Sequence, residues 1–225
     1  MTTADTREPL PGAGPAWPAE RRAVTALRLP WLYLVSRRAP AALGLLAGLA
    51  VLLWSALFWH WGISGGRAAQ QFISLTIESA AAAVIAVTTY GPFGEPERST
   101  GRWLPYLRLG ATLALTGIAI GALQLGVTGS SLPGGVLVLA RNVIGITGIG
   151  LLASLVTGGL LAWILPLGYV GFAEYALNEA WRNPWTWPVR PPADRGAWIC
   201  AGLVFAVGLA AVTFRGARTS LADNG

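Results

Sequence analysis

The chain has 225 residues, of which 54% are hydrophobic and only 12% charged, and its formal net charge is +6. All 16 cationic side chains are arginine, with one histidine and one cysteine. Without lysine there is no GxxxxGK phosphate loop and no Schiff base, and one histidine with one cysteine cannot form the usual zinc cage. The arginines flank apolar runs, where they act as membrane topology signals, so no nucleic-acid partner is expected.

The first 39 residues divide into two parts. Residues 1–22 are rich in proline, glycine and charge, which predicts a disordered tail. Residues 23–39 mix apolar side chains with arginines, which suits an interfacial amphipathic segment on the membrane surface, and Pro30 interrupts any helix there.

Six apolar stretches follow and predict an all-α integral membrane protein. The first, residues 41–61, has no charged side chain, and at about 1.5 Å per residue it is long enough for roughly 30 Å of hydrocarbon. The six-helix transmembrane domain covers residues 40–218, and residues 219–225 form a second tail. The predicted spans are residues 41–61, 70–89, 104–125, 135–156, 159–177 and 196–214.

Arginine placement sets the expected orientation. Most arginines outside the spans fall on the side that holds both termini and the link of residues 91–103, so that side is predicted to be cytoplasmic. The tryptophans cluster at span ends, as in interfacial aromatic belts. Gly44 with Gly48, and Gly117 with Gly121, have the spacing that lets helices approach closely in lipid, although glycine is also simply common in membrane helices.

The link of residues 91–103 gathers four charges between two apolar spans: Glu95, Glu97, Arg98 and Arg102. An ordinary cytoplasmic loop needs some charge to stay in water, and a docking surface for a soluble partner is the alternative. Exposed ion pairs with such a partner contribute about 1 kcal/mol or less each. Apolar packing by Phe93 and Trp103 is therefore expected to add comparable anchoring.

The ERSTG stretch of residues 97–101, after the second of six spans, resembles the E-R-x-x-G-T motif of permease subunits of ABC-2 type ABC transporters. Here threonine precedes the glycine. The resemblance implies a type V exporter-like architecture, in which this link is a coupling helix seated on a separate ABC ATPase subunit that binds the ATP and magnesium. It also implies a second permease copy or a paralogue as partner, and membrane lipid around both. The alanine-rich, arginine-only composition is similar to that of actinobacterial proteins, so a bacterial cell membrane is expected.

Residues 178–198 combine tryptophans and prolines and are too polar to cross the membrane. In the ABC-2 family the corresponding region forms short re-entrant or interfacial helices that close the exit, which makes Trp185, Trp187 and Arg190 candidates for an external gate segment. An ordinary aromatic belt is the alternative.

Two charges lie inside predicted spans, Glu78 in the second and Arg141 in the fourth. Both sit on the order of 10 Å from the external ends of their spans, so we hypothesise an intramembrane Glu78–Arg141 pair. As alternatives, Arg141 snorkels outward, or Glu78 is protonated or faces a subunit interface. Asn142 and Thr147 are interpreted as polar contacts between helices.

The leading functional hypothesis is a non-enzymatic permease subunit of an ATP-driven exporter. The main alternative is an accessory or structural multi-pass protein of another complex. An intramembrane enzyme is disfavoured because no aspartate lies in a span and the chain has no HExxH motif. Proton-coupled transport through Glu78 stays open, without an evident inverted repeat to support it.

Overall fold

A computed structural model describes residues 39–59, 66–88, 104–129, 135–158, 161–179 and 183–215, which all belong to one compact unit. Several predictions from the sequence lie outside these residues. They are the tails of residues 1–22 and 219–225, all of the surface segment but Ala39, and the link charges Glu95, Glu97, Arg98 and Arg102.

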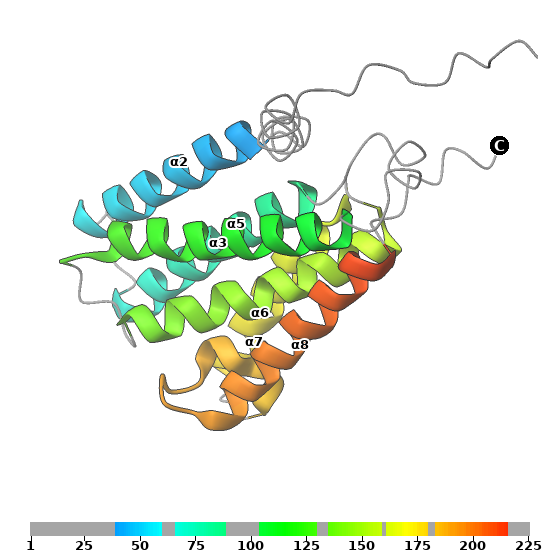
Figure 1. Ribbon diagram of the computed structural model, residues 1–225. Coiled ribbons are helices and arrows are strands. Elements are labelled where there is room, and N and C mark those ends of the chain that lie inside the picture. Colours follow the sequence, from blue (N-terminus) through cyan, green and yellow to red (C-terminus); the bar gives the residue numbers. More distant parts are fainter. Residues whose placement is uncertain are drawn as a thin grey trace, which may run out of the picture. The chain divides into compact units, whose positions relative to one another are not determined.

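The described residues form helices and contain no strand. The helices are α2 (Ala39–Phe58), α3 (Gly66–Thr88), α5 (Leu104–Val127), α6 (Gly135–Val156), α7 (Ile164–Asn178) and α8 (Arg195–Arg215) (Figure 1). A short 3₁₀ helix, η2 (Pro184–Val189), precedes α8. Left-handed glycines follow two of the long helices, Gly129 after α5 and Gly158 after α6, because a residue without Cβ adopts that conformation without strain.

Five described helices are long and apolar enough to cross a membrane: α2, α3, α5, α6 and α8. Their apolar stretches of 20 to 23 residues match the thickness of a bilayer core. This part of the sequence prediction is confirmed at the level of an all-α, multi-pass membrane protein.

The fifth predicted span differs from the structure. The sequence suggested residues 159–177, whereas α7 begins only at Ile164 and has 15 residues, about 22 Å at 1.5 Å per residue. A turn occupies Leu161–Trp163 before it. Pro166 lies in the first turn of α7, where a backbone N–H would have no acceptor within the helix, so the proline costs no helical hydrogen bond. The described helix is therefore shorter than an ordinary span.

Even so, α7 returns the chain across the bundle. α6 and α8 run parallel, because Gly148 lies against Phe205 and the later Gly208 lies against the carbonyl of Gly148 and the side chain of Leu151. α7 runs the opposite way. Its Pro166 lies beside Gly150 of α6, whereas the later Tyr169 contacts Trp187, which packs on the earlier Gly145. The next helix, α8, can thus start from the same end as α6 (Figure 1).

α3 is also parallel to α6. Its Glu78 bonds to Asn142, and eight residues later Ala86 lies beside Gly150. A buried apolar cluster joins α2, α3, α5 and the first half of α6. Its largest fully buried members are Leu46, Leu53, Ile85, Leu123 and Val143.

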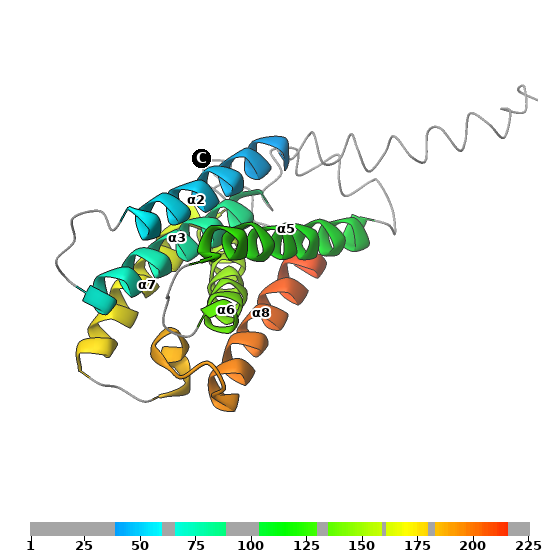
Figure 2. The ribbon, with the colours of Figure 1, turned by 90° about the vertical axis from the view of Figure 1, so that its left-hand side faces the viewer.

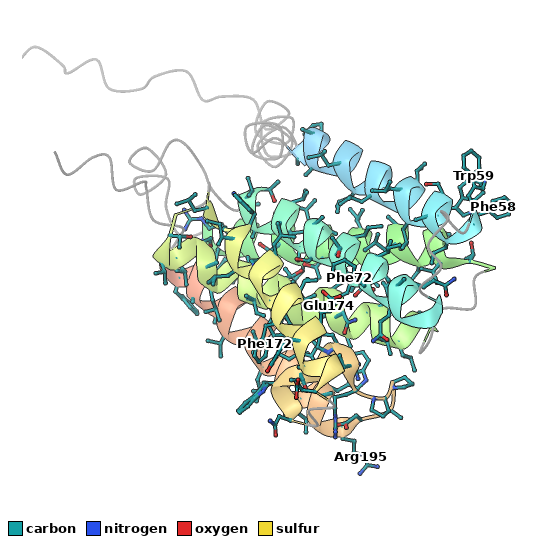
Figure 3. All side chains as sticks on the ribbon, turned by 180° about the vertical axis from the view of Figure 1, so that it is seen from behind. Phe58, Trp59, Phe72, Phe172, Glu174 and Arg195 are labelled. Atoms are coloured by element: carbon teal, nitrogen blue, oxygen red, sulfur yellow. The ribbon has the colours of Figure 1, made fainter. Side chains whose placement is uncertain are left out.

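Glycines permit close approach between helices, but they are not the glycines with the four-residue spacing that the sequence analysis singled out. A Cβ on Gly44, Gly48, Gly117 or Gly121 would meet nothing within 4 Å, so no other described helix packs on these positions. The close contacts come instead from Gly126, Gly148, Gly150 and Gly208, where a Cβ would lie 2.6 to 2.9 Å from atoms of a neighbouring helix. Large apolar side chains, including Phe58 and Trp59 at the end of α2, are exposed around the bundle (Figure 3).

Candidate functional site

A buried carboxylate links α3 to α6. Glu78 is 2% exposed and accepts a hydrogen bond from the hydroxyl of Ser74, one turn earlier in α3, at 2.7 Å. Its second oxygen accepts a bond from the side-chain amide of Asn142 at 2.9 Å. Both carboxylate oxygens therefore have a donor inside the bundle, which offsets part of the cost of burying them.

The neighbouring residue, Arg141, is fully buried and faces a different partner. Its two terminal nitrogens donate hydrogen bonds to the backbone carbonyls of Pro191 at 2.8 Å and Arg190 at 2.9 Å. These carbonyls lie between η2 and α8. A planar guanidinium suits this task because its two N–H groups point in fixed directions at two adjacent acceptors.

The structure therefore places Glu78 and Arg141 in adjacent helices without a direct ion pair between these two described side chains. Glu78 takes its hydrogen bonds from an amide and a hydroxyl, and Arg141 donates to backbone carbonyls. The structure thus gives Glu78 and Arg141 each a different partner from the one that the sequence hypothesis assigned. Successive helical residues point about 100° apart, so Asn142 faces α3 while Arg141 faces the segment before α8.

That segment, residues 183–194, is here called the tryptophan segment. Its Trp187 is 2% exposed, and the indole lies against Gly145, where an added Cβ would come within 2.7 Å of the ring. The ring of Tyr169, from α7, lies 4.8 Å away, centroid to centroid, at a tilt of 30°. Only glycine at position 145 leaves room for this indole, so the segment is fitted to α6.

Side chains of three helices bind the backbone of the tryptophan segment. Arg141 of α6 holds its C-terminal end. The hydroxyl of Tyr169, from α7, donates to the carbonyl of Trp185, and the amide of Gln71, from α3, donates to that of Pro188 at 3.4 Å. The segment thus bridges α3, α6 and α7. In Figure 2 it lies beside α6 and the start of α8.

The junction with α8 is fixed by local contacts. Arg190 forms an ion pair with Asp194, and a carboxylate oxygen of Asp194 accepts the backbone N–H of Ala197 at 3.0 Å, as a helix N-cap does. The indole of Trp198 donates to the carbonyl of Pro192 at 2.9 Å. The Ala197 N–H, followed by the Arg190 guanidinium, lowers the pKa of the Asp194 carboxyl below its ordinary value.

The three proposed gate residues have different environments. Trp187 is a buried anchor, Trp185 is 55% exposed and suits a membrane or water interface, and Arg190 combines an ion pair with a carbonyl that binds Arg141. Sequence reasoning did not single out Gln71, Tyr169 or Gly145 as parts of this site. The one available signal was Gly145, which stands one helical turn after a charged residue in an apolar span.

Some buried polar atoms of the site have no hydrogen-bond partner: Nε of Arg141, Oδ1 of Asn142 and Nε1 of Trp187. The first and third of these atoms belong to side chains that contact the tryptophan segment, and the second belongs to the α3–α6 contact. Among the described residues, no group of three or more His, Cys, Asp or Glu side chains is placed to hold a metal ion. No family model, curated protein or solved structure matches this chain.

Proposed function

We propose that this chain is the membrane-spanning permease subunit of an ATP-driven ABC transporter, of ABC-2 type and working as an exporter in a bacterial cell membrane. In this proposal a separate ATPase subunit binds ATP and magnesium and docks on the link of residues 91–103. A second copy, or a related permease, completes the pathway, and the chain performs no chemistry of its own.

One observation carries the proposal: α3 connects two features that a permease needs at opposite ends. Near its start, Gln71 binds the tryptophan segment. Its described end, Thr88, lies 17 residues later, about 26 Å along the axis, directly before the charged link. A push on the link would therefore act on the same helix that helps hold the tryptophan segment.

The test is recovery of an ATPase from native membranes with an affinity-tagged chain. A variant reversing four charges, Glu95→Arg, Glu97→Arg, Arg98→Glu and Arg102→Glu, is compared with wild type. Several charges are reversed together because each exposed pair contributes only about 1 kcal/mol or less. A variant with Arg7→Glu and Glu8→Arg in the N-terminal tail is the matched control.

The proposal expects an ABC ATPase to copurify with wild type and with the tail control, and to be lost with the four-charge variant. Equal ATPase recovery with all three chains would remove the link from the proposal. Recovery of a different complex without any ATPase would favour the accessory or structural alternative.

A further inference from the structure

Two hydrogen-bonded contacts start from consecutive residues of α6. Asn142 binds Glu78 of α3, and Arg141 binds the carbonyls of Arg190 and Pro191. A helix backbone is stiff, so a shift or rotation of α6 moves both side chains together. A movement of α6 therefore changes its contacts with both α3 and the tryptophan segment.

α3 reaches the same segment independently. Gln71 and Glu78 are seven residues apart, two turns along one face of α3, and Gln71 donates to Pro188. The segment therefore keeps all its backbone contacts only while α3 and α6 hold one particular offset. The segment contacts each helix through its own backbone carbonyls, whereas the Glu78–Asn142 bond lies directly across the two helices.

We propose that the Glu78–Asn142 contact sets the register of α3 against α6 and thereby determines whether the tryptophan segment stays docked. Loss of this contact frees α3 to move, so that Gln71 and Arg141 no longer bind the segment at once. The segment then lifts from Gly145, and Trp187 leaves its buried position. This coupling needs no partner protein and does not rest on the transport proposal.

The experiment measures how fast a cysteine at the buried position 186 reacts with a maleimide in the purified, detergent-solubilised chain. Thr186 is fully buried in the tryptophan segment, so a Thr186→Cys substitution reports each undocking event. The native thiol is removed first by Cys200→Ala. In a parallel series Val212→Cys, at a buried position near the end of α8, reports general loosening of the bundle away from the α3–α6 interface.

Asn142→Ala removes the contact between the helices, and Arg141→Met removes the direct contact with the segment. Ser79→Ala and Thr147→Val are matched controls, because both hydroxyls are buried in the same two helices and have no hydrogen-bond partner. We expect Arg141→Met to raise the reaction rate of T186C about tenfold. Asn142→Ala, acting through the helix register, is expected to raise it about threefold.

Both controls should leave the T186C rate unchanged, and V212C should stay slow in every variant. An unchanged T186C rate in Asn142→Ala would overturn the proposal, even with a fast rate in Arg141→Met, because the segment would then depend on Arg141 alone. Equal acceleration by the two controls would overturn it as well.

If Asn142→Ala also accelerates V212C, Asn142→Leu decides. Leucine nearly keeps the side-chain volume at position 142 but cannot donate a hydrogen bond to Glu78. A faster T186C reaction with a slow V212C reaction then supports the coupling, and no change in T186C contradicts it.

Discussion

Asn142 donates its side-chain amide to Glu78 across the α3–α6 interface, at 2.9 Å, while the adjacent Arg141 binds backbone carbonyls in the tryptophan segment. Glu78 and Arg141 thus have different structural roles. Glu78 joins two helices, and Arg141 joins a helix to a short segment that does not cross the bundle.

A charge exchange between Glu78 and Arg141 should fail. Glu78→Ala and Arg141→Ala should each destabilise the protein, by about 1–3 kcal/mol, because buried partners lose their hydrogen bonds. The double variant Glu78→Arg with Arg141→Glu should be no more stable than the single variants, since a carboxylate at 141 cannot donate to two carbonyls. The measurement is unfolding by SDS in mixed micelles, and recovery of wild-type stability by the exchange would show a direct ion pair.

Gly145 should not tolerate a methyl group. In Gly145→Ala the new Cβ would lie 2.7 Å from the indole of Trp187, so the ring or α6 must move, at a cost of about 1–3 kcal/mol. Gly117→Ala is the control, because a Cβ there meets nothing within 4 Å. SDS unfolding should show a loss for the first variant and none for the second, and equal stability of both would contradict the docking of Trp187 on α6.

The α6–α8 interface offers a similar comparison within one helix. In Gly208→Ala the Cβ would lie 2.7 Å from the carbonyl oxygen of Gly148, a backbone atom that cannot swing away. Gly202→Ala, six residues earlier in α8, has open space around its Cβ. Thermal unfolding followed by size-exclusion chromatography should separate the two variants. Equal stability of the two variants would contradict the close packing of α8 on α6 at Gly208.

Asp194 should make the start of α8 sensitive to acid. Its pKa is lowered in the folded protein from the ordinary 3.8, mainly by the N–H of Ala197. A group with a lowered folded pKa contributes stability above its unfolded pKa and loses it as pH falls through the folded value. The stability difference between wild type and Asp194→Asn should be constant at pH values well above the ordinary 3.8 and should shrink as the pH falls below it. A difference that persists at the acid end would mean that the carboxylate charge is not what matters.

The helices could be predicted from apolar length, and the contacts between them could not. Residues 135–156 match α6 at both ends because glycine and turn residues bound the apolar run. α7 was predicted five residues too early because the run continues through a turn at Leu161–Trp163 that hydrophobicity does not reveal. Proline in the first turn of that helix was the available sign.

The sequence predicted the depth of Glu78 and Arg141 along their helices, but not which neighbour each side chain faces. Counting residues from the span ends put Glu78 and Arg141 at similar depth, and both are buried in neighbouring helices. Which side chain faces which helix depends on rotation about the helix axis, and a shift of one residue turns the contact by about 100°. The fit of Trp187 against Gly145 joins positions 42 residues apart and has no local pattern.

The central claim is that the tryptophan segment and the charged link lie on opposite faces of a membrane. In a Cys200→Ala background, Ala193→Cys places a thiol at an exposed position of the segment, and Ser99→Cys places one in the link. A membrane-impermeant maleimide is applied to intact cells and to permeabilised cells.

The account predicts that A193C reacts in intact cells and that S99C reacts only after permeabilisation. Reaction of S99C in intact cells, or of both thiols from the same side, would contradict it.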